Sequence, residues 1–248
     1  MKDIVLENLT VGYRSGRREK AVAQNLCATV KGGRLTCLTG RNGSGKTTLL
    51  RTLAGFQPPL AGRWLLRDTE RQEELVNPSP LPTTIGVVLT ERLPNEGLRM
   101  REVVALGRTP YTNFWGTLDQ EDREIVATAI RQTGLTGMEE RLMGTLSDGE
   151  RQRVFVAKVL AQQTPVILLD EPMAFLDHPG KQELFQLLVR LAHEEGKTIL
   201  LSTHDLELAE KYADEFIETP SRPPRGEGEK TPTPTLPEGR EESLNSKI

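Results

Sequence analysis

The sequence predicts an α/β protein with a central parallel sheet, an antiparallel β layer and an inserted α-helical lobe. Two short, mostly apolar runs at 166–169 and 198–202 are typical of strands in a parallel sheet that is covered on both faces. Strand-like segments at 3–11 and 21–30 predict the antiparallel layer. From about 91 to 163 the apolar residues recur with helical spacing, which predicts the lobe.

The remaining elements of the first half follow from local signals. A polar loop is expected to join the first two strands, and Gly55 suits the position just beyond a helix end. A charged, proline-containing stretch is typical of a loop. In chain order, these expectations give a strand at 35–39, a helix at about 47–54, a strand at 62–67, a loop at 68–82 and a strand at 85–89.

Two helices and a change of composition organise the second half. Two sets of apolar residues recur with helical spacing, and each predicts one helix. The first set is followed by Gly134 and the second by Gly196, as at helix ends. These sets comprise Ile125, Val126, Ala129 and Ile130, and then Leu184, Leu187, Leu188 and Leu191. Residues 219–248 are rich in proline and charge and contain no aromatic residue, so they cannot bury enough apolar surface to fold. We therefore predict one domain at 1–218 and a disordered tail at 219–248.

Composition limits the function classes. The chain has 248 residues, 27% of them charged, and a formal net charge of −3, which argues against nucleic acid as the main partner. No apolar run approaches the roughly 18 residues that span a bilayer, and the first residues do not read as a secretory signal. Cys27 and Cys37 are expected to be buried and reduced. Neither they nor the three histidines show metal-ligand spacing.

A glycine-rich loop between the strand at 35–39 and the following helix predicts a phosphate site. Its glycines let backbone N–H groups surround a phosphate at the positive end of the helix. Lys46 supplies a charge to the β- and γ-phosphates of ATP, and the Thr47 hydroxyl can bind Mg²⁺. The segment is Gly40, Arg41, Asn42, Gly43, Ser44, Gly45, Lys46 and Thr47, with Thr48 next in the helix.

Polar groups also follow the two buried strands. Asp170 and Glu171 end one strand, and His204 follows the other. Because ligands bind outside the carboxyl ends of parallel strands, these groups are expected beside the phosphate loop. We expect Asp170 to hold Mg²⁺, Glu171 to act as general base towards water, and His204 to contact the γ-phosphate. Alone, an acid pair at a strand end is a helix cap or turn about half the time, and a lone His204 would more often be structural. Together with the phosphate loop, the functional interpretation is favoured.

A third motif precedes the last helix of the lobe. Ser147 and Glu150 have the spacing of a helix capping box. That local role does not explain Gly149, which lies between them.

These motifs, in this order, resemble those of ABC ATPases over about residues 3–217. Ser147, Gly149 and Glu150 resemble the signature segment, Gly40 to Thr47 the Walker A loop, and Asp170-Glu171 the Walker B end. Tyr13 matches the residue that stacks on adenine, Asp177 lies in a segment resembling the D-loop, and His204 matches the switch histidine. The resemblance implies a RecA-like P-loop NTPase core.

The resemblance also implies an assembly. It implies a head-to-tail homodimer with two ATP molecules, each between one subunit's phosphate loop and the other's signature segment. It implies integral-membrane permease subunits, indirectly a substrate-binding protein, and a peripheral position on the cytoplasmic face of the inner membrane. The stretches 102–111 and 146–152 look most like importers of iron-siderophores, haem and cobalamin, with residues near 91–115 lining the permease groove. For Tyr111, Phe114 and Trp115, ordinary packing in the lobe remains an alternative.

Three other functions remain open. One is an exporter half, although exporters often fuse this domain to membrane helices, which this sequence lacks. A soluble ABC-type ATPase acting on DNA or ribosomes is disfavoured by the acidic balance and the single nucleotide domain. A nucleotide-binding scaffold without hydrolysis conflicts with the presence of Glu171 and His204.

The sequence departs from the family in two places. Thr90 stands where the family usually has a Gln that touches Mg²⁺, and either Thr90 or Glu91 is expected to take that role. The low-complexity tail replaces the strands with which relatives usually continue. We expect deletion of residues 221–248 to leave ATPase activity intact.

Overall fold

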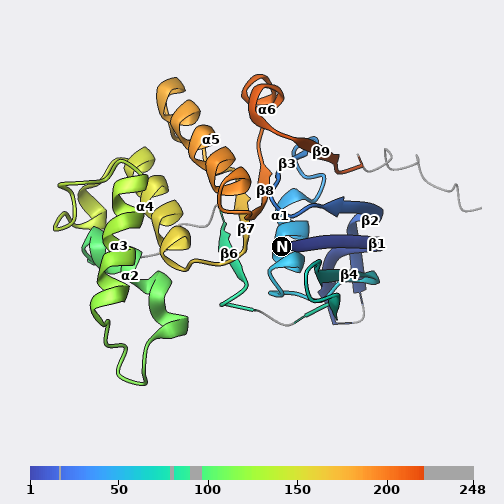
Figure 1. Ribbon diagram of the computed structural model, residues 1–248. Helices are drawn as coiled ribbons and strands as arrows, with labels where there is room; N and C mark the ends of the chain where they lie inside the picture. The colour runs from blue at the N-terminus through green and yellow to red at the C-terminus, as the bar shows by residue number, and fades with distance from the viewer. Residues whose placement is uncertain (17, 79–80, 90–96, 221–248) are drawn as a thin grey trace, which may run out of the picture.

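Two sheets organise the molecule, and the computed structural model describes residues 1–16, 18–78, 81–89 and 97–220 (Figure 1). One sheet is antiparallel and has the strand order β2-β1-β4-β5; the other is parallel and has the order β6-β7-β8-β3-β9. The antiparallel strands are β1 (Lys2–Ser15), β2 (Arg18–Val30), β4 (Ala61–Asp68) and β5 (Glu73–Val76). The parallel strands are β3 (Leu35–Thr39), β6 (Ile85–Val88), β7 (Val166–Asp170), β8 (Thr198–Ser202) and β9 (Glu215–Glu218).

The antiparallel sheet confirms the three predicted strands and corrects two predicted loops. β1 continues to Ser15, which pairs with Arg18 at the start of β2, so most of the expected polar loop is part of the two strands. Within the segment predicted as a loop at 68–82, residues 73–76 form β5 against β4. All four β5 residues are exposed. An edge strand without a buried face has no alternation of apolar and polar residues, which explains why the sequence did not reveal it.

The parallel sheet has the order expected of an open α/β sheet. α1 (Lys46–Leu53) lies between the two sheets, and α5 (His178–His193) packs on the other face of the parallel sheet with α6 (Leu206–Tyr212) beside it (Figure 1). β7 and β8 are wholly buried, as their apolar composition predicts. The carboxyl ends of β3, β7 and β8 therefore meet at one edge.

The helical lobe lies at the end of the molecule opposite the antiparallel layer (Figure 1). Its helices α2, α3 and α4 contact one another, and a buried ion pair joins Arg108 to Asp122 at 2.7 Å. Asp119 caps α3 through the amide of Asp122. The helical elements are α2 (Met100–Ala105), η1 (Leu106–Tyr111), α3 (Gln120–Gln132), η2 (Met143–Thr145) and α4 (Asp148–Ala161).

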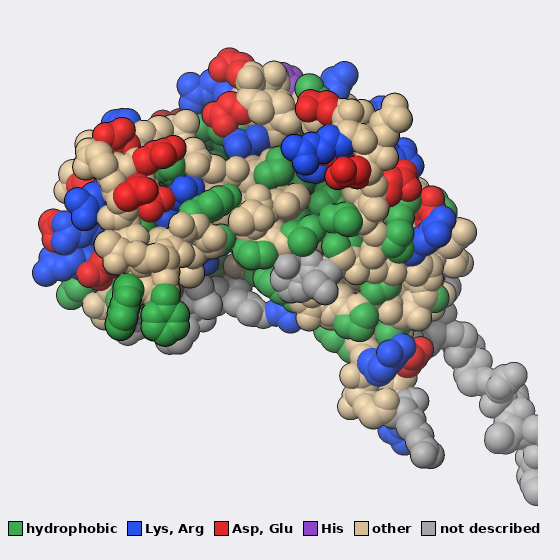
Figure 2. Space-filling view, turned by 60° about the horizontal axis from the view of Figure 1, so that its bottom comes forward, with side chains coloured by type: hydrophobic (Ala, Val, Ile, Leu, Met, Phe, Trp, Pro, Cys, Tyr) green, Lys and Arg blue, Asp and Glu red, His purple; other side chains and the backbone are tan. Residues whose placement is uncertain are grey.

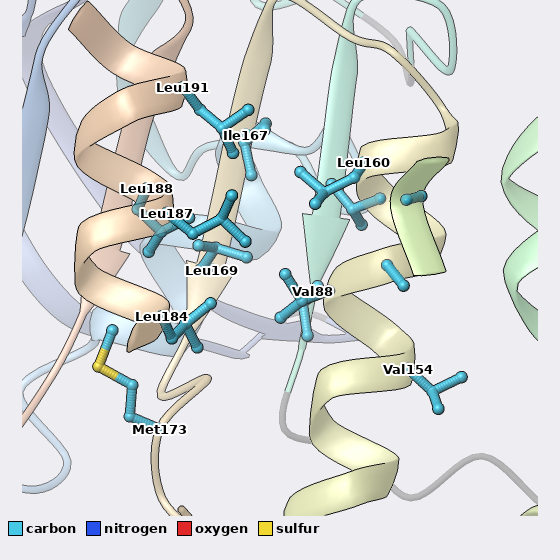
Figure 3. Packing of buried hydrophobic residues seen from close by; sticks show 14 of the residues in the cluster. Val88, Val154, Leu160, Ile167, Leu169, Met173, Leu184, Leu187, Leu188 and Leu191 are labelled. Atoms are coloured by element: carbon cyan, nitrogen blue, oxygen red, sulfur yellow. The ribbon is translucent and has the colours of Figure 1, made fainter. Parts of the chain in front are cut away.

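Two apolar cores cover the two faces of the parallel sheet. One joins the antiparallel layer and α1 to the first face. The other joins α5 and the helical lobe to the second face. Figure 3 shows α5 directing its leucines towards Ile167 and Leu169 of β7, with Val88 and Leu160 on the lobe side. Because both faces of the parallel sheet are covered by these cores, its strands are held in place, and so are the polar groups at their carboxyl ends.

The cysteines divide between the interior and the surface. Cys37 is fully buried in β3, and burial raises the pKa of its thiol to about 12. The prediction that Cys27 is buried was wrong. In β2 the side chains of Leu26 and Cys27 point to opposite faces, and Leu26 takes the inner one.

The part of the chain that the structure describes has no helix both long enough and apolar enough to cross a membrane. On the face seen in Figure 2, acidic and basic side chains are interspersed over the helical lobe. On this face, the described residues of the lobe therefore form no single-sign patch of the kind typical of nucleic-acid binders.

Candidate nucleotide site

The phosphate loop lies between β3 and α1, as predicted. Gly40, Gly43 and Gly45 all have positive φ angles, of 144°, 76° and 102°. A side chain at Gly45 would be disfavoured for two reasons. The positive φ is one that residues other than glycine seldom adopt, and a Cβ atom there would lie only 3.1 Å from a methyl carbon of Val22. The loop therefore takes the compact form in which backbone N–H groups can surround an anion.

Lys46 begins α1 and reaches back over the loop. Its Nζ donates to the Gly40 carbonyl at 2.8 Å and to that of Arg41 at 3.4 Å. Desolvation lowers the pKa of Lys46, although the charges of Glu171 and Asp170 oppose this change. A partly desolvated ammonium group attracts an incoming anion strongly, because the electrostatic attraction is less weakened by solvent there.

Asp170 is a centre of hydrogen bonds at the edge of the sheet. It is 1% exposed and accepts hydrogen bonds from the Thr47 hydroxyl at 2.7 Å and the Ser202 hydroxyl at 2.6 Å. Asp170 and Ser202 are register partners on β7 and β8. The structure thus brings together Asp170 and Thr47, the two described residues of the predicted metal set.

Glu171 has a strained backbone and a fixed neighbour. Its φ of 49° lies in the left-handed region that non-glycine residues seldom adopt. Its amide donates to the Ser202 hydroxyl oxygen at 3.0 Å and to the Ser202 carbonyl at 3.2 Å. His204 Nε2 lies 2.7 Å from Glu171 Oε1, so the two predicted catalytic side chains are in contact.

A cavity of about 540 Å³ opens beside the loop. Tyr13 is half-exposed at this cavity, and its hydroxyl lies 3.0 Å from that of Thr48. A flat ring beside the phosphate loop suits stacking on a nucleotide base. The lining residues are Tyr13, Lys20, Ala21, Val22, Asn42, Gly43, Gly45, Lys46, Thr47, Thr48 and Glu171.

The signature segment lies apart from this cavity. Ser147 accepts from the amide of Glu150 at 3.2 Å, and the Glu150 carboxylate accepts from the amide of Ser147 at 2.7 Å, which confirms the capping box. The same amide of Ser147 holds the pKa of Glu150 below its usual value. Asp177 caps α5 by accepting from the amide of Gly180 at 3.1 Å. A second cavity of about 510 Å³ is lined by Ser147, Gly149, Glu150, Phe175 and Asp177, among others.

In the single chain, Ser147, Gly149, Glu150 and Asp177 therefore line a different cavity from Tyr13 and the phosphate loop. His204 lines a third cavity of about 450 Å³, which it shares with Glu171. Four further residues were missed by sequence reasoning: Ser202, Lys20, Ala21 and Val22. Ser202 was within reach of prediction, because a hydroxyl at the end of a buried strand lies next to the acid that ends its neighbour. Thr90 and Glu91 lie outside the described residues.

Comparison with known proteins places this geometry in a family. Residues 23–174, more than half of the chain, match the family described as ABC transporter. The chain is 37% identical to the achromobactin transport ATP-binding protein of Dickeya dadantii, over 90% of this chain and 80% of that protein. It is also 37% identical to the ferric enterobactin transport ATP-binding protein of Escherichia coli, over 85% and 76%. The iron(3+)-hydroxamate import ATP-binding protein of Bacillus subtilis is 34% identical, over 88% and 78%.

Solved structures agree with the sequence matches. A metal-chelate type ABC transporter in an inward-facing conformation superposes with a TM-score of 0.73 at 25% identity, covering 88% of this chain and 80% of that one. A dimeric ATP-binding cassette in a post-hydrolysis state with ADP and Pi gives 0.74 at 26% identity, covering 87% and 94%. The chain belongs to the ABC transporter family, as an ATP-binding and ATP-hydrolysing subunit.

Proposed function

We propose that the chain energises import of an iron chelate of the siderophore class, by binding and hydrolysing ATP at the cavity beside the phosphate loop. The observation that carries the assignment of the site is the joined set Thr47–Asp170–Ser202, next to Lys46. In this proposal the loop amides and Lys46 hold the phosphates, and Tyr13 supports the base.

The oxygen atoms of Thr47 and Asp170 fit a magnesium ion. Both are hard donors, they lie 2.7 Å apart, and Asp170 is fixed by Ser202. Among the described residues, no cluster of three or more His, Cys, Asp or Glu side chains could hold a metal on its own. This suits Mg²⁺, which usually takes one or two protein ligands together with substrate phosphates. When bound, the ion would neutralise charge on the β- and γ-phosphates.

Glu171 is suited to remove a proton from the attacking water. Its carboxylate lines the cavity, and one of its oxygen atoms is held by His204 at 2.7 Å. The second oxygen remains available as an acceptor, and the backbone that carries it is fixed by two contacts with Ser202. In this proposal Glu171 orients and deprotonates water, while His204 positions Glu171 and reaches towards the γ-phosphate.

The separation of the two cavities supports a head-to-tail dimer. Ser147 caps the N-terminus of α4, so the positive end of that helix can face a phosphate presented by another subunit. Two copies related by a two-fold axis would then form two complete ATP sites. A similar solved cassette is dimeric. In this proposal ATP closes the dimer, and hydrolysis reopens it.

Relatives support the cargo class and the permease partner. Ferric enterobactin and iron(3+)-hydroxamate, named for two of them, are iron chelates. In this proposal the dimer docks at the cytoplasmic face of the membrane on separate permease subunits, which receive the chelate from a substrate-binding protein. The interspersed charges seen in Figure 2 favour this partner class over nucleic acid.

Co-purification tests the assembly. The tagged chain is isolated from gently solubilised native membranes, and its partners are identified by mass spectrometry. We expect a polytopic permease and a binding protein for an iron chelate. Ribosomal or DNA-associated partners without a permease would overturn the import proposal and leave the ATPase standing.

A further inference from the structure

Thr219 immediately follows β9, and its side chain is buried against the phosphate loop. It is 0% exposed. Its hydroxyl lies 2.5 Å from the hydroxyl of Ser44, within the loop, and 3.1 Å from the carbonyl oxygen of Thr39, where β3 ends. Its amide donates to the same Thr39 carbonyl at 2.9 Å. One residue near the end of the domain therefore joins both the strand and the loop of the nucleotide site.

The directions of these hydrogen bonds follow from a count of hydrogens. The Thr219 hydroxyl has one hydrogen, which it donates to the Thr39 carbonyl. The hydrogen in its contact with Ser44 must then come from Ser44. Ser44 is 4% exposed, so water has little access to replace the lost partner. A buried hydroxyl that loses its partner costs more than the mean value of a hydrogen bond.

Gly40 explains how closely Thr219 approaches. A Cβ atom on Gly40 would lie 2.2 Å from Thr219 Oγ1 and 2.8 Å from Ser44 Oγ. Thr219 thus fills the space beside the first glycine of the loop. The carbonyl of Gly40 in turn accepts from Lys46 Nζ at 2.8 Å. A displacement of Thr219 would therefore shift Gly40 and, through the hydrogen bond to its carbonyl, the ammonium group of Lys46.

We infer that Thr219 is a positioning residue of the nucleotide site, which holds the phosphate loop in its binding form through Ser44 and Gly40. It reaches the nucleotide only through these residues, and the inference rests on the proposed function of the loop. A loop that is already in its bound shape loses less conformational entropy when the phosphates bind. The hydroxyl of Thr219 thereby raises nucleotide affinity more than it affects the chemical step.

The test uses the full chain and titration calorimetry with ADP, together with steady-state ATPase rates. Thr219→Val keeps the shape and branching of the side chain and removes the hydroxyl. We expect its Kd for ADP to rise about fivefold, with kcat changed less than about twofold. Thr219→Ser, which keeps the hydroxyl, should bind nearly as wild type does. Ser44→Ala should weaken binding as Thr219→Val does, and the double variant should be no weaker than either.

A matched control separates this role from general loss of stability. Thr133 is also a buried threonine, but its hydroxyl bonds to helix carbonyls in the lobe. Thr133→Val should leave ADP affinity unchanged. A wild-type-like Kd for Thr219→Val, equal weakening by Thr219→Ser, or multiplied effects in the double variant would overturn the inference. If the wild type binds no ADP, or Lys46→Ala binds it equally well, the proposed nucleotide site fails instead.

Discussion

The phosphate loop and the signature segment achieve their geometry in opposite ways. In the loop, Thr47 bonds to Asp170 and Ser44 to Thr219, so its partners lie more than a hundred residues away. In the signature segment, Ser147 and Glu150 satisfy each other three residues apart. The loop is therefore a product of the whole fold, whereas the signature segment is a local motif. Substitutions far away in the sequence can therefore remove hydrogen bonds of the loop, whereas the capping box of the signature segment depends on its own two residues.

Among substitutions near the phosphate loop, we expect Glu171→Gln to have the largest effect on ATP turnover. Loss of a general base typically slows turnover by a factor of about 10² to 10⁴. Glu171→Gln should lower the ATPase kcat at least about 100-fold while retaining ATP affinity, because the amide keeps the size of the side chain. Rapid-quench and ATP-binding measurements check this. Turnover within about tenfold of wild type would exclude Glu171 as the base.

The buried pair Arg108–Asp122 tests the lobe that carries the signature segment. Asp122→Ala leaves the Arg108 guanidinium buried without its counter-charge, and breaking such pairs costs about 3 kcal/mol. We expect this loss in the free energy of unfolding, measured by denaturant titration. The Kd for ADP should stay unchanged, because the pair lies in the lobe. A large loss of ADP affinity in the folded variant would contradict the independence of the two regions.

The same pair has a defined pH dependence. The hydrogen bond from Arg108 lowers the pKa of Asp122 in the folded chain below that of the unfolded chain. Its stabilisation is therefore complete above the unfolded pKa, about 3.9, and is lost as pH falls through the lower folded pKa. The stability difference between wild type and Asp122→Asn should thus be constant near neutral pH and shrink under acid. A difference that grows on acidification would contradict this assignment.

The contrast between local and distant contacts also explains what the sequence could predict. The capping box of Ser147 and Glu150 was readable, because both residues lie within one helical turn. The edge location of Asp170 and His204 followed from the burial of β7 and β8. Ser202 could have been placed near Asp170, because both residues end buried strands, but their pairing as register partners is set by the sheet and not by a local pattern.

At the C-terminal end of the domain, amino-acid composition did not predict the burial of Thr219. The low-complexity segment was expected to begin at Thr219, yet Thr219 is fully buried at the phosphate loop. Composition averages over many residues, whereas one hydroxyl is enough to fix this contact. Residues 221–248 lie outside the described residues, so the tail remains a prediction.

A smaller effect is expected at Ser202, which links the two acids of the site. Ser202→Ala removes the hydroxyl that donates to Asp170 and that the Glu171 amide approaches. A lost hydrogen bond to a charged group costs about 1.5–3 kcal/mol, so kcat should fall roughly tenfold or more, with ADP affinity nearly unchanged. Ser15→Ala, at an exposed position, serves as the control. An unchanged kcat for Ser202→Ala would show that Asp170 and Glu171 are positioned without it.

The head-to-tail dimer is the central claim, and its mass in solution tests it most directly. The chain has a mass of 27.6 kDa. With saturating ATP and Mg²⁺, the full-length Glu171→Gln variant should sediment as a dimer, and without nucleotide as a monomer. Adding Ser147→Arg should abolish the dimer while ATP still binds to the monomer, since the phosphate loop is untouched. A monomer at saturating ATP, or a dimer that tolerates Ser147→Arg, would contradict the shared ATP site.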